Sequence, residues 1–121
     1  MLIDLRTKDA NLTGAAVEQW LQAAGIIVNK NMVPFDTRKA METSGIRVGT
    51  PALTTRGLKE PEMKKVAEWF DRSASSAGDE KTLGRIRGEV AEFTRQYPLP
   101  HLECNVAAAK QTREPASVAA R

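Results

Sequence analysis

The chain has 121 residues, a net charge of +3 and the apolar and charged content of an ordinary globular protein. This length suits one small domain, and the mixing of Lys/Arg with Asp/Glu lacks the clustered basic face of nucleic-acid-binding proteins. No apolar run of bilayer length, no signal-peptide pattern and no pair of cysteines is present. We therefore expect a cytoplasmic protein that binds neither nucleic acid nor a membrane.

The first predicted elements are a strand, a helix and a second strand. Residues 2–6 favour a strand that is already under way at the first residue, and residues 7–12 form a polar connection. Thr13 is a suitable N-cap, and Gly25 a suitable C-terminal cap. Between them, apolar residues recur at the spacing of one helix face, namely Val17, Trp20, Leu21 and Ala24. The β-branched residues 26–28 predict the second strand.

A polar turn and a long connection follow. Asn29, Lys30 and Asn31 carry hydrogen-bond donors, which suits either a turn or a ligand site. We do not expect Lys30 to form a Schiff base, because an exposed turn offers no pocket that favours the neutral amine. Residues 32–43 form a connection of a length that is often functional.

Residues 44–57, SGIRVGTPALTTRG, contain the most informative pattern. Ile46 and Val48 alternate with Arg47 and a glycine, which predicts a short strand with one apolar face, and Pro51 ends its ladder. An arginine held on a strand beside glycine suits two-pronged binding of a carboxylate or phosphate. A solvent-facing arginine on an edge strand has the same pattern, and the spacing alone favours that interpretation.

Two helices are predicted after this motif. Arg56 either bonds carbonyl groups or adds positive charge to a cleft, and the bend expected at Gly57 favours the first role. Pro61 fits the first turn of a helix whose predicted core stripe is Met63, Val66, Ala67 and Phe70, widened by Trp69. Small residues at 73–78 interrupt the pattern. Asp79 then caps a helix with a second apolar stripe, namely Leu83, Ile86, Val90, Phe93 and Tyr97.

These elements predict an α+β domain, with a small antiparallel sheet, helices packed on one face and Arg47 on the other. We assign residues 1–100 to the domain. From residue 101 the composition becomes rich in alanine and polar residues without an apolar stripe, so residues 101–121 predict a disordered tail. His101 and Cys104 lie in this tail without partners at ligand spacing, and we expect no metal site and no catalytic pair there.

The run at residues 44–57, preceded by VNKN at residues 28–31, closely resembles the C-terminal domain of serine hydroxymethyltransferase, with collinear motifs over residues 1–100. The resemblance implies the small domain of a fold-type I pyridoxal-phosphate enzyme, which interconverts serine and glycine and transfers one carbon to tetrahydrofolate. It implies that Arg47 binds the amino-acid carboxylate and that Asn31 lies near the pteridine of the folate. The family's Ser-Pro-Phe segment, which frames the folate site, corresponds to Lys39, Ala40 and Met41, whose side chains depart from that pattern.

The resemblance also implies that the groups holding pyridoxal phosphate belong to a large domain that no residue here matches. We therefore expect no catalytic residue in this chain, no activity of the chain alone, and a large cofactor-binding domain as its partner in cis or in trans. The parent enzyme would be a homodimer or homotetramer, in which Met1 corresponds to an internal position. The alternative is a non-catalytic, stand-alone binding module. Under either hypothesis, the sheet face and the missing start of the first strand would expose apolar area, so we expect the chain alone to self-associate or aggregate.

Overall fold

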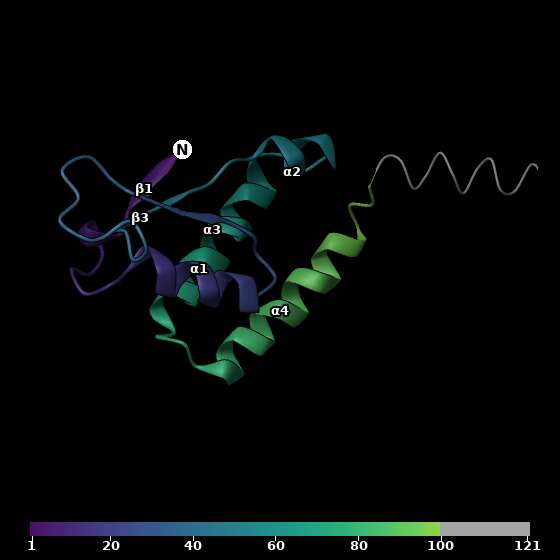
Figure 1. Ribbon diagram of the computed structural model, residues 1–121. Helices are drawn as coiled ribbons and strands as arrows, with labels where there is room; N and C mark the ends of the chain where they lie inside the picture. The colour runs from purple at the N-terminus through teal and green to yellow at the C-terminus, as the bar shows by residue number, and fades with distance from the viewer. Residues whose placement is uncertain (100–121) are drawn as a thin grey trace, which may run out of the picture.

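A computed structural model describes residues 1–99 as a small sheet with a layer of helices against it (Figure 1). This arrangement confirms the predicted α+β class. The predicted tail, with His101 and Cys104, lies outside the described residues. In chain order the elements are β1 (Leu2–Asp4), the 3-10 helix η1 (Leu5–Thr7), α1 (Gly14–Ala23), β2 (Asn29–Asn31), β3 (Gly45–Arg47), α2 (Pro51–Thr55), α3 (Glu60–Ser75) and α4 (Glu80–Arg95).

The sheet has three strands in the order β1-β3-β2, and both pairings are antiparallel. Ile46 of the central strand pairs with Ile3 and Lys30, while Arg47 pairs with Leu2 and Asn29. Successive side chains of a strand point to opposite faces. Ile46, which is fully buried, therefore faces the helices, and Arg47 points to the other face.

The second strand begins three residues later than predicted. Residues 26–28 form no strand, and β2 is the Asn29–Asn31 segment expected as a polar turn. Ile26 and Val28 do pack against the core, whereas Ile27 is 76% exposed. The prediction was wrong because burial of an apolar run does not determine which residues enter the ladder. The pairing of β2 with β3 determines which residues enter the ladder, and the connection between these two strands sets the register of the pairing.

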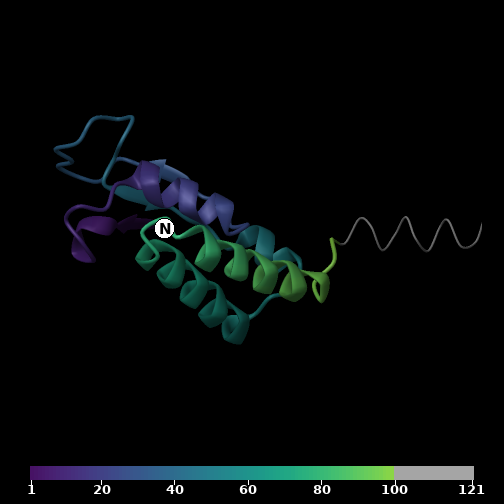
Figure 2. The same cartoon turned by 90° about the horizontal axis from the view of Figure 1, so that it is seen from below.

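The helical layer consists of α1, α3 and α4, which lie side by side (Figure 2). Thr13 caps α1 as predicted, because its side chain accepts a hydrogen bond from the backbone N–H of Ala16 at 3.2 Å. Gly25 has the positive φ of a helix C-terminal cap. Asp79 likewise caps α4 through the N–H of Thr82. The buried apolar side chains of this layer are Val17, Leu21, Ala24, Trp69, Ala74, Leu83 and Ile86.

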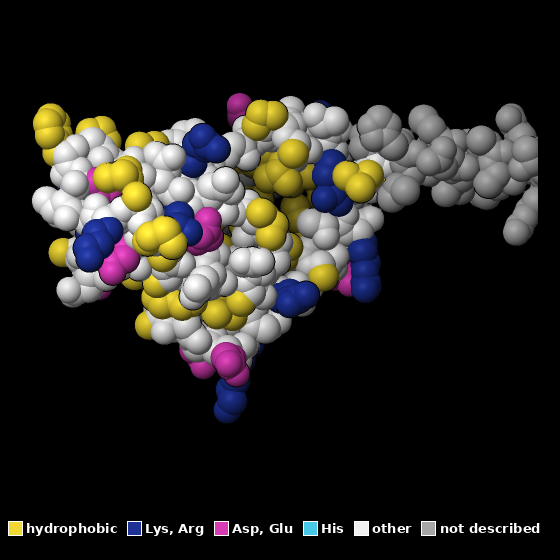
Figure 3. Space-filling model, viewed as in Figure 1, with side chains coloured by type: hydrophobic (Ala, Val, Ile, Leu, Met, Phe, Trp, Pro, Cys, Tyr) yellow, Lys and Arg dark blue, Asp and Glu magenta, His cyan; other side chains and the backbone are white. Residues whose placement is uncertain are grey.

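Helix α3 follows its predicted core stripe in part, since Val66 and Phe70 are half-buried and pack against the core as predicted. Its buried residues are Trp69, Ser73 and Ala74, whereas Ala67 is exposed. Met63 and Ala67 instead line a groove shared with Thr54 and Leu58. Figure 3 shows a hollow with hydrophobic side chains beside α2. The predicted stripe was wrong at Met63 and Ala67, which border this groove beside α2 rather than the core.

Helix α2 begins at Pro51, where the sequence predicted only the end of a strand. Proline suits the first position of a helix, since its missing N–H would have no intrahelical partner there. Arg56 then donates from Nε to the carbonyl of Tyr97 at 2.7 Å and from Nη2 to that of Thr94 at 3.0 Å. The structural role predicted for Arg56 is confirmed, but its carbonyl partners lie at the end of α4.

Two glycines bring α1 and the central strand into close contact. A Cβ at Gly14 would lie 2.1 Å from Thr43 Oγ1 and 2.5 Å from the carbonyl oxygen of Gly45. The N–H groups of Gly14 and Ala15 donate to the carbonyls of Thr43 and Glu42, at 3.0 and 2.9 Å. The first turn of α1 is thus fixed to the segment that leads into β3. No helix within residues 1–99 is long and apolar enough to cross a membrane.

Candidate functional site

Arg47 lies at the uncovered end of the sheet face that points away from the helices. Its side chain is exposed, and its cross-strand neighbours Leu2 and Asn29 are exposed as well. Within residues 1–99, no hydrogen bond or ion pair engages its guanidinium group. The N–H donors of Arg47 are therefore available to an anion, and the flat fork of a guanidinium matches the two oxygens of a carboxylate.

Asn31 lies on the same face of the sheet as Arg47. It pairs with Gly45, two positions before Arg47 on the central strand, and strand side chains alternate with a period of two. The Asn31 side chain is half-buried, and its Nδ2 donates to the carbonyl of Met32 at 2.7 Å. The structure therefore brings these two predicted site residues to one surface.

Lys30 turns to the opposite face, toward α1. Its Nζ donates to Glu18 at 3.1 Å, and its backbone N–H donates to the same carboxylate at 2.9 Å. These contacts, led by the backbone hydrogen bond, hold the pKa of Glu18 below its usual value. An ammonium group that is paired in this way is not the free amine that a Schiff base requires.

The connection between β2 and β3, residues 32–44, folds over the other half of the open sheet face. Val33 is buried there, and a Cβ at Gly45 would lie 2.4 Å from its Cγ1. Lys39, Ala40 and Met41 are all exposed, and the carbonyl of Lys39 accepts hydrogen bonds that close a turn. No hydrogen bond or ion pair in the described chain joins these three side chains to Arg47 or Asn31.

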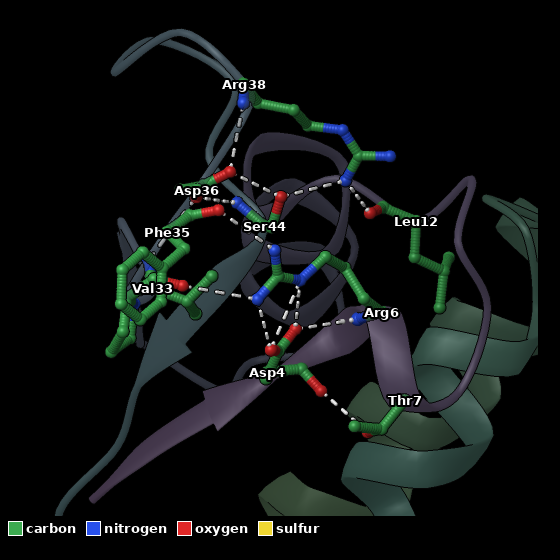
Figure 4. A network of polar contacts seen from close by, with 10 residues as sticks. Asp4, Arg6, Thr7, Leu12, Val33, Phe35, Asp36, Arg38 and Ser44 are labelled. Carbon is green, nitrogen blue, oxygen red and sulfur yellow. Dashed lines mark hydrogen bonds and ion pairs between the residues drawn. The ribbon is translucent and has the colours of Figure 1, made fainter.

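Asp36 holds this connection in place (Figure 4). Its carboxylate accepts hydrogen bonds from the N–H groups of Val33, Arg38 and Ser44 and from the Ser44 hydroxyl, the last at 2.7 Å. Burial acts to raise the pKa of Asp36, but these hydrogen bonds outweigh it, and the pKa lies far below the ordinary value of 3.8. Asp36 thus ties the start of the connection to the residue before β3.

Two arginines join the connection to the rest of the domain (Figure 4). Arg38 donates to the carbonyls of Leu12 and Ala10, which precede α1. Arg6 donates to Asp4 at 2.7 Å and makes a longer contact of 3.4 Å with the carbonyl of Phe35. Arg38 thus ties the connection to the residues before α1, and Arg6 reaches it from the segment after β1, so contacts with the rest of the domain fix its backbone conformation.

Replacement of Asp36 by asparagine is expected to reduce stability more at neutral pH than in acid. The folded-state pKa is lowered, so the stabilising effect of the carboxylate is complete above 3.8 and is lost as the pH falls below that value. Thermal unfolding of both proteins at neutral pH and at about pH 2 measures this difference. Glu92→Gln is the control, because Glu92 makes only an exposed pair with Arg95. An equal cost of Asp36→Asn at both pH values would contradict this assignment.

The sequence analysis missed Asp36 and Arg38 as organising residues. It predicted residues 32–43 as a connection, and the structure confirms that no helix or strand forms there. A carboxylate two residues before an arginine, with a serine ahead of the next strand, was the available signal. Such short-range patterns are common in turns, so the signal alone does not identify the partners.

The site is a guanidinium and an amide on the open face of a small antiparallel sheet, bordered by a fixed connection, in a domain of the α+β class. Residues 1–70 match the family model described as serine hydroxymethyltransferase. The chain is also 52% identical over 99 residues to a serine hydroxymethyltransferase of Myxococcus xanthus (strain DK1622), a match that covers 82% of this chain and 23% of the relative.

The chain therefore belongs to the serine hydroxymethyltransferase family. It spans about a quarter of the length of that curated relative. In the described part of the chain, no group of three or more His, Cys, Asp and Glu side chains is placed to hold a metal ion.

Proposed function

We propose that this chain is the C-terminal, substrate-binding part of a serine hydroxymethyltransferase, in which Arg47 binds the carboxylate of serine or glycine. The observation that carries the proposal is the exposed Arg47 guanidinium on the sheet face away from the helices, within a chain of this family. Asn31 lies on the same face and would donate to or accept from the pteridine of tetrahydrofolate. Lys39, Ala40 and Met41 would contribute to the folate site mainly through their backbone.

The chemical contribution of Arg47 is orientation together with affinity. Two parallel N–H···O bonds fix the plane of the carboxylate, and with it the direction of the bonds at the neighbouring carbon atom. A hydrogen bond to a charged group contributes about 1.5–3 kcal/mol. The position of Arg47 on the central strand, between β1 and β2, gives this anchor a rigid support.

Pyridoxal phosphate would supply the electron sink for the reaction. The residues of this chain would bind the substrate next to the cofactor but would not hold the cofactor itself. Lys30, which precedes Asn31, is paired with Glu18 on the other face of the sheet. The cofactor would thus be held by the polypeptide that corresponds to the rest of the relative, joined to this chain in cis or in trans within a homodimer or homotetramer. The chain alone would turn over no serine.

Arg47→Lys is expected to weaken glycine binding at least about tenfold, because a single ammonium group cannot reproduce the two-pronged contact. The test is a chimera in which the 99 matched residues of this chain replace the corresponding segment of the Myxococcus relative. Glycine affinity is measured by titration of the purified chimera. Arg85→Lys is the matched control, since Arg85 is exposed on α4. Equal glycine affinity of the Arg47→Lys and parent chimeras would refute the assignment.

The alternative remains a stand-alone binding module that uses the same sheet face for another partner. The two proposals differ in the chimera experiment. A chimera that binds glycine and interconverts it with serine supports the enzyme part, whereas a folded chimera without either property favours the module.

A further inference from the structure

Phe35 combines two properties that do not help this chain to fold. Its side chain is 96% exposed, and its φ of 56° lies in the left-handed region, where a residue with a Cβ is strained. The ring buries almost no surface within residues 1–99, and its backbone conformation lowers stability. A residue that is strained and exposed in this way indicates a function other than stabilising the fold.

The backbone on both sides of Phe35 is held firmly. Asp36, the next residue, accepts four hydrogen bonds, and the carbonyl of Phe35 accepts one from Arg6 at 3.4 Å (Figure 4). The ring is therefore presented from a fixed position, which reduces the entropy lost when a partner binds it.

Other exposed apolar side chains accompany Phe35 on residues 32–44. Met41 is 77% exposed and Met32 is 46% exposed, and Leu2 of the neighbouring sheet is 42% exposed. Figure 3 shows hydrophobic side chains spread over this end of the molecule. Aromatic residues that enter a pocket supply much of the affinity of protein interfaces, and surrounding apolar contacts exclude water.

We propose that Phe35 is an anchor that inserts into an apolar pocket on the polypeptide corresponding to the remainder of the enzyme. This inference rests on the proposed function. The chain covers only 23% of its Myxococcus relative, so a much larger protein surface is expected beside it. The helices described here pack on one sheet face and do not cover Phe35, Met41 and Leu2. These three side chains are therefore available to contact the larger protein surface.

The substitution Phe35→Asn tests the proposal through the sign of its effect in two proteins. Asparagine tolerates the left-handed region, so in the chain alone it should raise the thermal midpoint by about 4 °C. In the chimera it should lower the midpoint, because the docked ring is lost. Phe35→Tyr keeps the ring and should leave both midpoints nearly unchanged.

Ala77→Asn is the matched control. Ala77 also has a positive φ, of 49°, and is exposed, but it lies in the turn between α3 and α4. It should stabilise both proteins alike. A rise of the midpoint in both proteins for Phe35→Asn would overturn the proposal. Sedimentation of the chain alone gives a second test. If the chain self-associates and Phe35→Asn abolishes this, the proposal is also overturned, because Phe35 would then bind a second copy of the chain. Loss of glycine binding by the chimera would remove the proposed function but would not alter the opposite shifts expected for Phe35→Asn.

Discussion

Gly45→Ala is expected to destabilise the chain by about 3 kcal/mol, because the new methyl group has no space. A Cβ at this position would lie 2.9 Å from the carbonyl oxygen of Asn31 and 3.0 Å from that of Ile3, in addition to 2.4 Å from Val33 Cγ1. The Val33 side chain can rotate, but the two carbonyls belong to the strands on either side of β3. Urea unfolding of the purified chain measures the loss.

Gly49→Ala is the control from the same motif. A Cβ at Gly49 would meet only Pro51 Cδ, at the ordinary contact distance of 3.5 Å, so its cost should be within about 0.5 kcal/mol of zero. Adding Val33→Ala to Gly45→Ala should recover only part of the loss, since the backbone contacts remain. A Gly45→Ala chain as stable as the parent would show that the sheet and the connection are less closely packed than described.

The close packing at Gly45 also links the fold to the proposed site. Val33 covers one half of the open sheet face at Gly45, and Arg47 remains uncovered two residues later. A larger residue at position 45 would move the connection and the central strand apart. We therefore expect Gly45→Ala to displace both the Arg47 anchor and the loop that carries Phe35.

Local signals in the sequence were sufficient for the caps and for the central strand. Thr13, Gly25 and Asp79 act at the helix ends where they were predicted, because capping depends on contacts within one turn. Arg47 and Ile46 point to opposite faces as their alternation predicted. These features depend on neighbouring residues, and the sequence states which residues are neighbours.

Features that depend on partners distant in sequence could not be predicted. The start of β2 depends on pairing with β3 across residues 32–44, and which residues of α3 are buried depends on its packing against α1 and α4. The contacts of Asp36 with Ser44 and of Arg38 with Leu12 join residues 8 and 26 positions apart. The proposed roles of Arg47, Asn31, Lys39, Ala40 and Met41 stay predictions of the resemblance.

Trp69→Ala is expected to cost about 3–5 kcal/mol, the usual loss for a buried aromatic residue. Trp69 is 2% exposed and meets Phe93 edge to face, with ring centroids 5.2 Å apart. Its Nε1 donates to Glu89 at 2.8 Å. Glu89 also accepts from Arg72, and hydrogen bonds from Arg72 and then Trp69 lower its pKa to about 2. Replacement by alanine therefore removes core packing and one support of a carboxylate that joins α3 to α4.

Two further variants separate these contributions and test which residues of α3 form its core face. Trp69→Phe keeps much of the apolar volume but removes the N–H donor, so its cost should be clearly smaller than that of Trp69→Ala. Met63→Ala should also cost less, because Met63 is only half-buried and lines the groove beside α2. The stripe predicted from sequence places Met63 in the core and Trp69 at its margin. Urea unfolding that gave Met63→Ala the larger loss would restore that stripe and contradict the packing of α3 described here.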